Sequence, residues 1–393
     1  MQASPQKAAH AMNLPALRTS LVLAALLTLP LPRATQAASV NAGAIAPDAA
    51  APFAVRNIAT FDGPWAIAFL PDGRLVVTEK AGRMFLATQA GAKTAIHGIP
   101  AVYDRGQDGL LDVAPSPDFD RDRTLYFTFV ALDRAGGALV LARARLEESA
   151  GGARLSAPET LWRQQPSSRG GQPGGIIAFS PDGRHVFLAV GDRMEPETAQ
   201  DPDAARGKIL RLNRDGSAPA DNPMAGQAGI RALTWTTGHR NPYGLAFAPD
   251  GRLWEHEMGP RGGDELNLIL PSKNYGWPVV SNGDQYSGIP IPRHGTHPEF
   301  EAPFVYWTPV IAPAGLAFYQ GSQFPAWRGS ALIGGLVARG LVRIAFESDS
   351  ARQADRWSLG ARIRDVAVAP DGAVWIIQDG ADAALLRLTA GTR

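Results

Sequence analysis

The strongest candidate for an anion-binding group is the string GHRNPYGL at Gly238–Leu245. Arg240 and Asn241 stand directly before an apolar run that leads into a Pro-Asp-Gly turn, so both are expected on a loop. The guanidinium group of arginine offers a planar fork of donors that suits a carboxylate. A surface salt bridge within the chain is the alternative use of such an arginine.

A second pair of arginines lies in Arg362–Val366 (RIRDV). Arg362 and Arg364 are two residues apart on a predicted strand, so both side chains should point to one face. Two like charges on one face favour an anion between them. Solvent exposure, or pairing with Asp365 and Asp379, is the alternative.

An acidic, turn-rich string, Met258–Asn267 (MGPRGGDELN), is the candidate cation site. Gly259 and Pro260 have no ligating side chains, but their carbonyl oxygens could reach a hard cation. Calcium takes mixed carbonyl and carboxylate oxygens at about 2.3–2.6 Å. Capping of the loop is the alternative role for Asp264 and Glu265.

The segments that carry these residues must be held in place by regular structure. The sequence contains a repeated pattern that is typical of paired β-strands. An alternating apolar run, Pro-Asp-Gly and a second alternating run recur along the sequence. The copies lie at Ala66–Thr78, Ile176–Val190, Leu245–Trp254 and Val366–Ile376, with a degenerate copy at Asp112–Tyr126. Period-two alternation marks a half-buried strand, and Pro, Asp and Gly suit the positions of a tight turn. Each copy is therefore predicted to be a β-hairpin.

The spacing of this repeat predicts the architecture. The turn prolines stand at positions 71, 117, 181, 249 and 370, and the last gap spans about two repeats. Leu316–Gly321, followed by Ser330–Ile333, fits the missing copy. The fold class is therefore predicted as all-β, a six-bladed β-propeller of four-stranded antiparallel blades. A two-domain sandwich is the alternative, although it would not explain a constant period.

The N-terminal segment has the pattern of an export signal. Lys7 and Arg18 precede an apolar run, Leu21–Leu31, that Pro30 interrupts, and Ala37 then offers a cleavage site. We therefore predict a periplasmic or secreted protein with no stable membrane insertion after cleavage. An uncleaved membrane anchor is the alternative.

The amino-acid composition is typical of a folded protein, and it excludes sites that need cysteine, such as thiolate zinc sites and iron–sulfur clusters. The chain has 393 residues, of which 45% are apolar and 19% charged, and it contains no cysteine. A net charge of +1 gives no reason to expect nucleic acid as a partner. The predicted organisation is a signal peptide over 1–38, a short linker over 39–51 and the propeller over 52–393.

Seven strings between the hairpins are distinctive. They are Gly106–Val113 (GQDGLLDV), Asp201–Arg211 (DPDAARGKILR), Gly238–Leu245, His256–Asn267 (HEMGPRGGDELN), Asn274–Pro278 (NYGWP), Tyr306–Gly315 (YWTPVIAPAG) and Arg362–Val366. In order and spacing they resemble the soluble PQQ-dependent aldose (glucose/sorbosone) sugar dehydrogenases. The resemblance implies oxidation of the C1 hydroxyl of an aldose to a lactone, with the electrons passed to an external acceptor.

The resemblance also implies roles for individual residues. The pyrroloquinoline quinone cofactor, PQQ, would be contacted by Gln107, Arg240, Asn241, Arg362 and Arg364. The calcium that binds PQQ would be held by the carbonyl oxygens of Gly259 and Pro260. A second, structural calcium would be bound by Glu265 and the backbone of Tyr275.

The chain departs from this family at the position of the general base. Oxidation at C1 removes a hydride and a hydroxyl proton, and the family carries a histidine before a Gly-Gly pair to accept the proton. The matching segment here is Gly171–Phe179 (GQPGGIIAF), in which Gln172 stands at the histidine position. A carboxamide has no basic site near pH 7, so Gln172 could orient a hydroxyl or a water but not accept its proton. Asp108 or Arg169 could substitute in part.

Two further departures lie on the cofactor side. The family usually places a lysine near Val337, a serine or threonine at the position of Val310, and a serine at the position of Ala314.

Three functions therefore compete for this chain. The first is a working sugar dehydrogenase, and the second is a catalytically weak or inactive propeller that binds calcium and PQQ or sugar. The third is a calcium-dependent propeller hydrolase or lactonase, disfavoured because the acidic residues cluster in one loop.

Overall fold

The computed structural model describes residues 39–168 and 170–391. The predicted signal peptide, Arg169 and residues 392–393 lie outside these residues. Regular structure in the described part of the chain is almost entirely β-strand, with one α-helical turn, α1 (Phe119–Asp122), and four short 3-10 helices. None of these helices is long and apolar enough to cross a membrane. The fold is all-β and of the propeller type.

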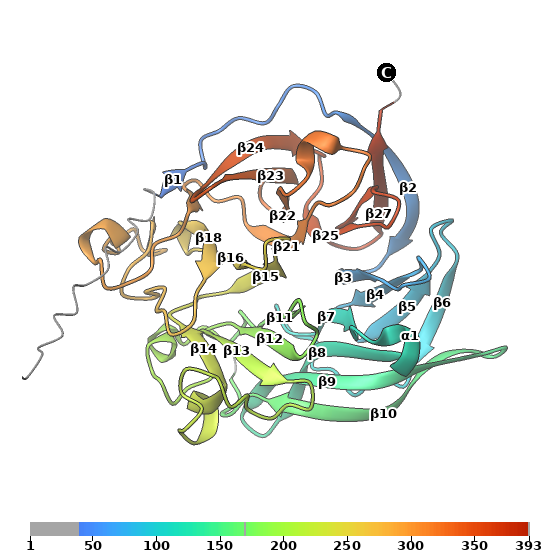
Figure 1. Ribbon diagram of the computed structural model, residues 1–393, viewed down its shortest axis with the longest axis horizontal. Helices are drawn as coiled ribbons and strands as arrows, with labels where there is room; N and C mark the ends of the chain where they lie inside the picture. Colours follow the sequence, from blue (N-terminus) through green and yellow to red (C-terminus); the bar gives the residue numbers. More distant parts are fainter. Residues whose placement is uncertain (1–38, 169, 392–393) are drawn as a thin grey trace, which may run out of the picture. The chain divides into compact units, whose positions relative to one another are not determined.

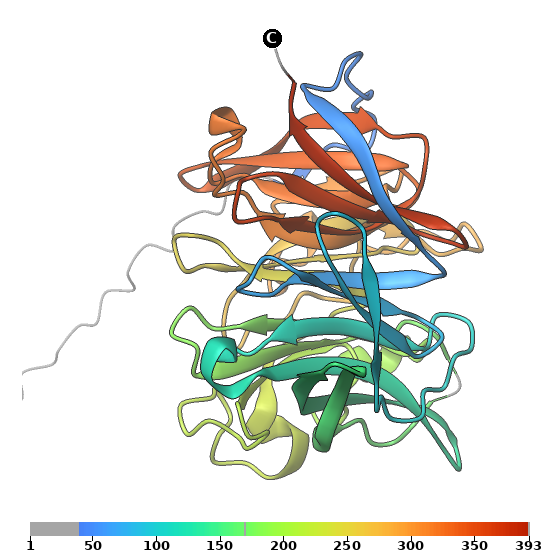
Figure 2. The same cartoon turned by 90° about the vertical axis from the view of Figure 1, so that its right-hand side faces the viewer.

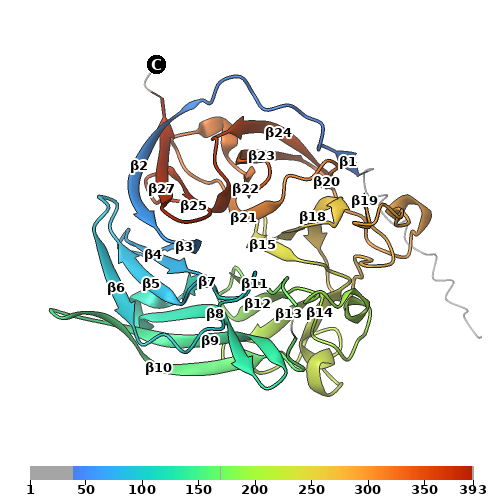
Figure 3. The same ribbon diagram turned by 180° about the vertical axis from the view of Figure 1, so that it is seen from behind.

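Six strands lie around the centre, and they come from well-separated parts of the sequence (Figure 1). They are β3 (Pro64–Phe69), β7 (Leu110–Pro115), β11 (Gly174–Phe179), β15 (Pro242–Phe247), β21 (Pro313–Phe318) and β25 (Ile363–Val368). Each of them contacts the next in this order, and β25 contacts β3. The series therefore closes on itself, as the view from behind also shows (Figure 3).

A sheet runs outward from each of these inner strands. In the first half of the chain the outer strands are β4 (Leu75–Glu79), β5 (Arg83–Ala87) and β6 (Lys93–His97) after β3; β8 (Thr124–Asp133), β9 (Gly136–Ser149) and β10 (Gly152–Arg163) after β7; and β12 (His185–Val190), β13 (Lys208–Asn213) and β14 (Thr234–Thr237) after β11.

In the second half, β16 (Leu253–Glu257), β18 (Asp264–Ile269) and β20 (Val305–Trp307) follow β15, and β22 (Ala331–Gly335), β23 (Gly340–Glu347) and β24 (Ser350–Ser358) follow β21. The short pair β17 (Arg261–Gly262) and β19 (Gly283–Asp284) is separate. Short 3-10 helices lie at η1 (Pro196–Ala199), η2 (Gly229–Leu233), η3 (His294–Thr296) and η4 (Pro325–Trp327).

The predicted hairpins are confirmed. Each Pro-Asp-Gly copy lies in the turn between an inner strand and the strand that pairs with it. The copy inferred without its marker is the hairpin β21–β22. The degenerate copy is a hairpin as well, but its turn contains α1, which the sequence did not predict.

The two ends of the chain meet in one sheet. β26 (Val374–Gln378) and β27 (Ala383–Ala390) follow β25, and β2 (Phe53–Phe61) pairs antiparallel with β27 (Figure 2). One buried apolar cluster likewise joins residues from both ends, among them Ile67, Val77, Trp375, Ile377 and Leu385. Strand β2, from the N-terminal part of the described chain, therefore completes the last sheet.

Two pairings depart from an arrangement of purely antiparallel, separate sheets. β10 pairs in parallel with β6, which joins the two neighbouring sheets at their outer edges. β1 (Val40–Asn41) pairs in parallel with β20, so the segment predicted as a linker contributes a strand. Neither pairing follows from the hairpin repeat, because both join strands that are distant in sequence.

All six inner strands carry a register shift near their first residues. The shifts lie between Pro64 and Ala66, Leu110 and Val113, Gly174 and Ile177, Pro242 and Gly244, Ala314 and Leu316, and Ile363 and Asp365. Such bulges bend a strand and re-aim its side chains. Because all six occur at the same end of the inner strands, they bring the preceding loops toward one region.

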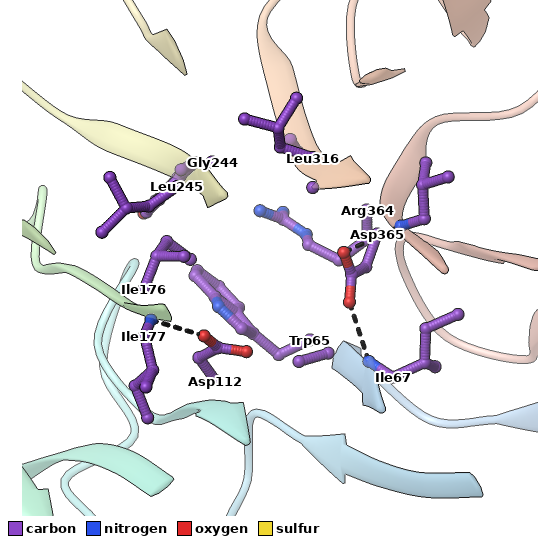
Figure 4. Close-up of a pocket in the computed structure, with 15 residues that line it drawn as sticks. Trp65, Ile67, Asp112, Ile176, Ile177, Gly244, Leu245, Leu316, Arg364 and Asp365 are labelled. Atoms are coloured by element: carbon purple, nitrogen blue, oxygen red, sulfur yellow. Dashed lines mark hydrogen bonds between the residues drawn. The ribbon is translucent and has the colours of Figure 1, made fainter. Parts of the chain in front are cut away.

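Two half-buried carboxylates at these bulges bond to the neighbouring inner strand. Asp112 Oδ2 accepts the N–H of Ile177 at 2.7 Å, and Asp365 Oδ2 accepts the N–H of Ile67 at 2.8 Å (Figure 4). Burial raises the pKa of Asp112 to about 7 and that of Asp365 to about 8, and the charge of Asp112 adds to the second shift. The Asp365 bond spans the junction between the two ends of the chain.

Replacing Asp365 with alanine is expected to lower the free energy of unfolding by about 1–3 kcal/mol, because the buried N–H of Ile67 loses its acceptor. Urea denaturation at pH 5 measures the change. The pKa of Asp365 is raised on folding, so its contribution is present at low pH and is lost as pH rises through about 8. The penalty should therefore shrink between pH 5 and pH 9.

Asp349→Ala is the control, because Asp349 is an exposed turn residue. It should change the free energy of unfolding by less than about 0.5 kcal/mol. Equal effects of the two substitutions would mean that the Asp365 bond does not hold the ring closed.

Candidate functional site

Gln107 and Gln172, predicted for the cofactor and base positions, lie together. Gln107 precedes β7 and Gln172 precedes β11, and the Gln107 Oε1 accepts the Gln172 N–H at 2.6 Å. Gln172 is buried and has a φ of 53°, in the left-handed region that non-glycine residues rarely adopt. The surrounding glycines allow the loop to reach this conformation.

The side-chain amide of Gln172 bridges the carboxylate of Asp192 and the guanidinium group of Arg240. With the amide oriented to match its partners, Nε2 lies 2.5 Å from Asp192 Oδ1 and Oε1 lies 2.7 Å from an Arg240 guanidinium nitrogen. Both ends of the carboxamide are therefore engaged. Gln172 as folded does not present a free group to a substrate hydroxyl.

Asp192 is a site residue that the sequence analysis missed. It follows β12, is buried, and accepts the N–H of Met194 at 2.9 Å and the indole N–H of Trp277 at 2.8 Å. Burial raises its pKa to about 6. Its position directly after a predicted strand, at the same end as the other site strings, was the available signal.

Arg240 lies at the centre of the site, on the predicted loop between β14 and β15. Its guanidinium donates to the carbonyl oxygens of Met258 at 2.9 Å and Gly259 at 3.0 Å. It also lies over the rings of Trp277, at 5.3 Å, and Tyr286, at 5.9 Å. No carboxylate of the described residues forms a salt bridge with this guanidinium. Tyr286, which is 70% exposed, was not predicted.

Two buried polar atoms near Arg240 have no partner in the described part of the protein. They are Asn241 Oδ1 and Tyr243 Oη. Tyr243 lines a cavity of about 130 Å³ in the ring of inner strands, together with Trp65 and Arg364 (Figure 4). Buried polar groups normally find partners, so this region is suited to a polar ligand.

Arg362 and Arg364 share one carboxylate. Arg362 Nε lies 2.7 Å from Asp379 Oδ2, and Arg364 Nη2 lies 2.7 Å from Asp379 Oδ1. The anion between the two guanidinium groups is therefore Asp379, which was the alternative to a ligand. One carboxylate balances one of the two charges, and the Arg364 guanidinium also lies 4.4 Å from the centroid of the Trp65 ring.

Asp108, a possible substitute base in the sequence analysis, is committed to an ion pair. Its oxygens lie 2.5 Å and 3.0 Å from the two terminal nitrogens of Arg193, and both side chains are buried. Arg193 and Met194 have φ angles of 59° and 62°. This buried pair holds a strained loop beside Asp192, and Asp108 is unsuited to accept a proton. Arg169 lies outside the described residues.

An acidic cluster occupies one face of the pair β16–β18. Glu255 is opposite Asn267 and Glu257 is opposite Glu265, so all four side chains lie on one face and are buried. Glu257 Oε1 lies 3.1 Å from Nδ1 of His239. Burial and the neighbouring carboxylate Glu257 raise the pKa of both Glu255 and Glu265 well above the usual range. Glu255 and Glu257 were not predicted as site residues.

Three of the four predicted metal ligands, Gly259, Glu265 and Tyr275, line one small cavity, and Pro260 is not among its lining residues. The cavity has a volume of about 10 Å³, and Gly259, Glu257, Glu265 and Tyr275 line it. That volume holds about one water-sized species. The ligand-loop residue Asp264 is buried and accepts the N–H of Gly259 at 2.9 Å and that of Ile311 at 2.8 Å.

The other two departures from the family lie at the same end of the inner strands. Val337 is 53% exposed in the loop after β22, and Ala314 lines the cavity of about 130 Å³. Val310 precedes β21 and is partly buried. None of these apolar side chains supplies the charge or hydroxyl expected there.

Comparison with known proteins finds one family over most of the chain. The family described as Glucose / Sorbosone dehydrogenase matches residues 61–387. The aldose sugar dehydrogenase YliI of Escherichia coli is 36% identical over 341 residues, covering 84% of this chain and 90% of that protein.

Solved structures agree with this match. A crystal structure of a glucose dehydrogenase is 41% identical, with a TM-score of 0.81 over 86% of this chain and 100% of that chain. The PQQ-bound aldose sugar dehydrogenase of Streptomyces coelicolor is 31% identical, with a TM-score of 0.71 over 88% of this chain and 99% of that chain.

Replacing Asp108 with alanine is expected to lower the free energy of unfolding by about 3–5 kcal/mol, because Arg193 would remain buried without its counterion. Urea denaturation followed by fluorescence measures the loss. Asp104→Ala is the matched control in the same loop, because Asp104 pairs with Lys80 at the surface. An exposed pair contributes about 0–1 kcal/mol. Comparable losses in the two variants would contradict the importance of the buried pair.

Proposed function

The chain belongs to the glucose/sorbosone dehydrogenase family, and from this premise we propose that it is a PQQ-dependent aldose dehydrogenase. It would oxidise the C1 hydroxyl of an aldose to a lactone and pass the electrons to an external acceptor. The observation that carries the proposal is the continuous polar network Gln107–Gln172–Arg240 at the end of the ring where all six bulges lie.

The charges of the site suit an anionic cofactor with several carboxylates. Arg240 forms no salt bridge within the described residues, and Arg362 and Arg364 share Asp379. One carboxylate thus lies between the guanidinium groups of Arg362 and Arg364, and the buried polar atoms Asn241 Oδ1 and Tyr243 Oη have no partner among the described residues. These features support PQQ binding by Gln107, Arg240, Asn241, Arg362 and Arg364.

PQQ, when bound, supplies an ortho-quinone that accepts two electrons and a proton from the substrate. The residues of this chain would hold its carboxylates through guanidinium groups and keep bulk water from the buried side of the site. The guanidinium group of Arg364 lies over the rings of Trp65 and Tyr243, and that of Arg240 lies over the ring of Trp277. The small-molecule substrate would be a sugar.

Calcium is the proposed metal. The cavity of about 10 Å³ beside Glu257 and Glu265 offers carboxylate oxygens and backbone of Gly259 and Tyr275, which is a donor set that suits a hard cation. Burying several carboxylates together is costly without a counterion. A divalent cation would offset the burial and the repulsion from Glu257 that together raise the pKa of Glu265.

The architecture and location complete the proposal. Six inner strands in a closed series, each with three outer partners, support a propeller of six four-stranded blades over 52–393. We place the protein in the periplasm or outside the cell after removal of residues 1–38, as the sequence predicts.

A catalytically weak or inactive propeller is the second candidate function. The observation that favours it is the engagement of both ends of the Gln172 amide by Asp192 and Arg240. Such a protein would bind PQQ, sugar and calcium without turnover.

Titration with PQQ in the presence of calcium distinguishes these functions. The wild type should bind PQQ and turn over aldoses with an artificial acceptor. Arg364→Gln should weaken PQQ binding by roughly ten-fold or more, because a charge-assisted bond to a carboxylate contributes about 1.5–3 kcal/mol. Arg328→Gln, at an exposed position, is the control.

PQQ binding without turnover would favour the second function over the first. Absence of PQQ binding would contradict both. Gln172→His should raise aldose turnover above that of the wild type, whether the wild type is active or inactive. The reason is that imidazole is basic near neutral pH and a carboxamide is not.

Calcium is expected to raise the midpoint of thermal unfolding, because a ligand that binds the folded state stabilises it. Glu265→Gln should reduce this calcium-dependent shift by at least about half, since one of the cavity's carboxylates is lost. Differential scanning calorimetry with and without calcium measures it. Glu299→Gln, an exposed substitution of the same type, should leave the shift unchanged. An unaltered shift in Glu265→Gln would remove this site as the source.

A further inference from the structure

We propose that Asp192 is the group that accepts the hydroxyl proton of the substrate, in place of the side chain at position 172. The inference rests on the proposed function. Asp192 is the carboxylate that contacts the Gln172 amide, with 2.5 Å between Oδ1 and Nε2. The residue at the expected base position is therefore held directly against a carboxylate.

The bonds of Asp192 leave it able to take a substrate hydroxyl. Oδ2 accepts the indole N–H of Trp277, and Oδ1 accepts the N–H of Met194 and the amide of Gln172. The Gln172 amide is a donor, and so is a sugar hydroxyl. A hydroxyl that takes the place of the amide N–H keeps the hydrogen-bond count of Oδ1 unchanged. Gln172 would then cover Asp192 until substrate displaces it.

Two other titratable groups near this site, Asp108 and His239, have fixed partners among the described residues. Asp108 is paired with Arg193. His239 lies with one ring nitrogen 2.9 Å from the hydroxyl of Thr236 and the other 3.1 Å from Glu257, and it has no exposed surface. These contacts leave Asp192 as the carboxylate best placed to act as base.

The charges around Asp192 come from three elements. Arg240, before β15, favours its ionised form, while Glu257, on β16, opposes it. Arg206, in the loop before β13, also faces it. With burial, the outcome is a pKa raised to about 6, so Asp192 is ionised at neutral pH and is a stronger base than an ordinary aspartate.

The step balances with the quinone of the bound cofactor as oxidant. The O–H bond of the C1 hydroxyl breaks and a bond from that proton to Asp192 Oδ1 forms. The electron pair of the C1–H bond leaves as hydride to the quinone, and the C–O bond becomes a carbonyl. Asp192 returns its proton to solvent before the next turnover.

Asp192→Asn tests the assignment, because asparagine keeps an acceptor for Trp277 and removes the base. Its kcat should fall by roughly 10²–10⁴-fold, which is the usual effect of losing a general base. Glu197→Gln, at an exposed position of the neighbouring η1 segment, is the control and should retain wild-type kcat. Adding Gln172→His to Asp192→Asn should recover at least roughly ten-fold in kcat, because an imidazole replaces the missing base.

Two further readouts separate a base from a structural role. The kcat/KM of the wild type should fall as pH drops below about 6, where Asp192 is protonated, and the acid limb should move in the Asp192→Asn, Gln172→His variant. PQQ titration of Asp192→Asn, followed by fluorescence, should give wild-type affinity.

The outcomes are distinct. Wild-type protein that binds PQQ without turning over aldoses overturns the proposed function and the base assignment together. Turnover in the wild type that survives in Asp192→Asn overturns the base assignment alone. A loss in Asp192→Asn that histidine does not rescue, with an unmoved acid limb, also overturns it and assigns Asp192 a structural role.

Discussion

Closure of the ring of inner strands is the constraint on which the site depends. β2 must pair with β27, and Asp365 must accept the N–H of Ile67, for the first and last sheets to meet. The site strings precede inner strands β7, β11, β15 and β25, so their spacing is set by the ring and not by local sequence. A ring left open would separate the two arginines near the C-terminus from the rest of the site.

The carboxylates on and beside these strands serve different purposes. Asp112 and Asp365 accept backbone N–H groups of adjacent strands, and Asp108 neutralises Arg193. Glu257 and Glu265 instead face each other across β16 and β18 beside a small cavity. Asp192 differs from all of these because its hydrogen-bond partners are a carboxamide, an indole and one backbone N–H. A raised pKa therefore marks several structural carboxylates here, and only the contacts of each group indicate its role.

Much of the fold could be predicted from the sequence because its physics is local. Alternating apolar residues and Pro-Asp-Gly turns act within ten or so residues, and the hairpins lie where the pattern places them. The proximity of Gln107, Gln172 and Arg240 could also be predicted in outline, since loops at one end of a ring must converge. The β6–β10 and β1–β20 pairings could not, because nothing in either strand specifies a distant partner.

The residues of the site were harder to predict where their role depends on partners that are distant in the sequence. Asp379 was identified as a possible partner of Arg362 and Arg364, and the structure confirms the pairing. Asp192 follows a strand with no motif of its own, and its importance appears only when Gln172 and Trp277 are brought against it. Glu255 and Glu257 lie within a predicted strand and belong to no motif. Only the register between β16 and β18 places them beside Asn267 and Glu265.

A crystal structure of the protein grown with PQQ and calcium tests whether both bind at this end of the ring. PQQ density is expected between Arg240 and Arg364, with the Gln107 side chain in contact, and a cation is expected in the cavity lined by Glu257 and Glu265. Density for PQQ elsewhere, or none under conditions where the cofactor is saturating, would contradict this placement.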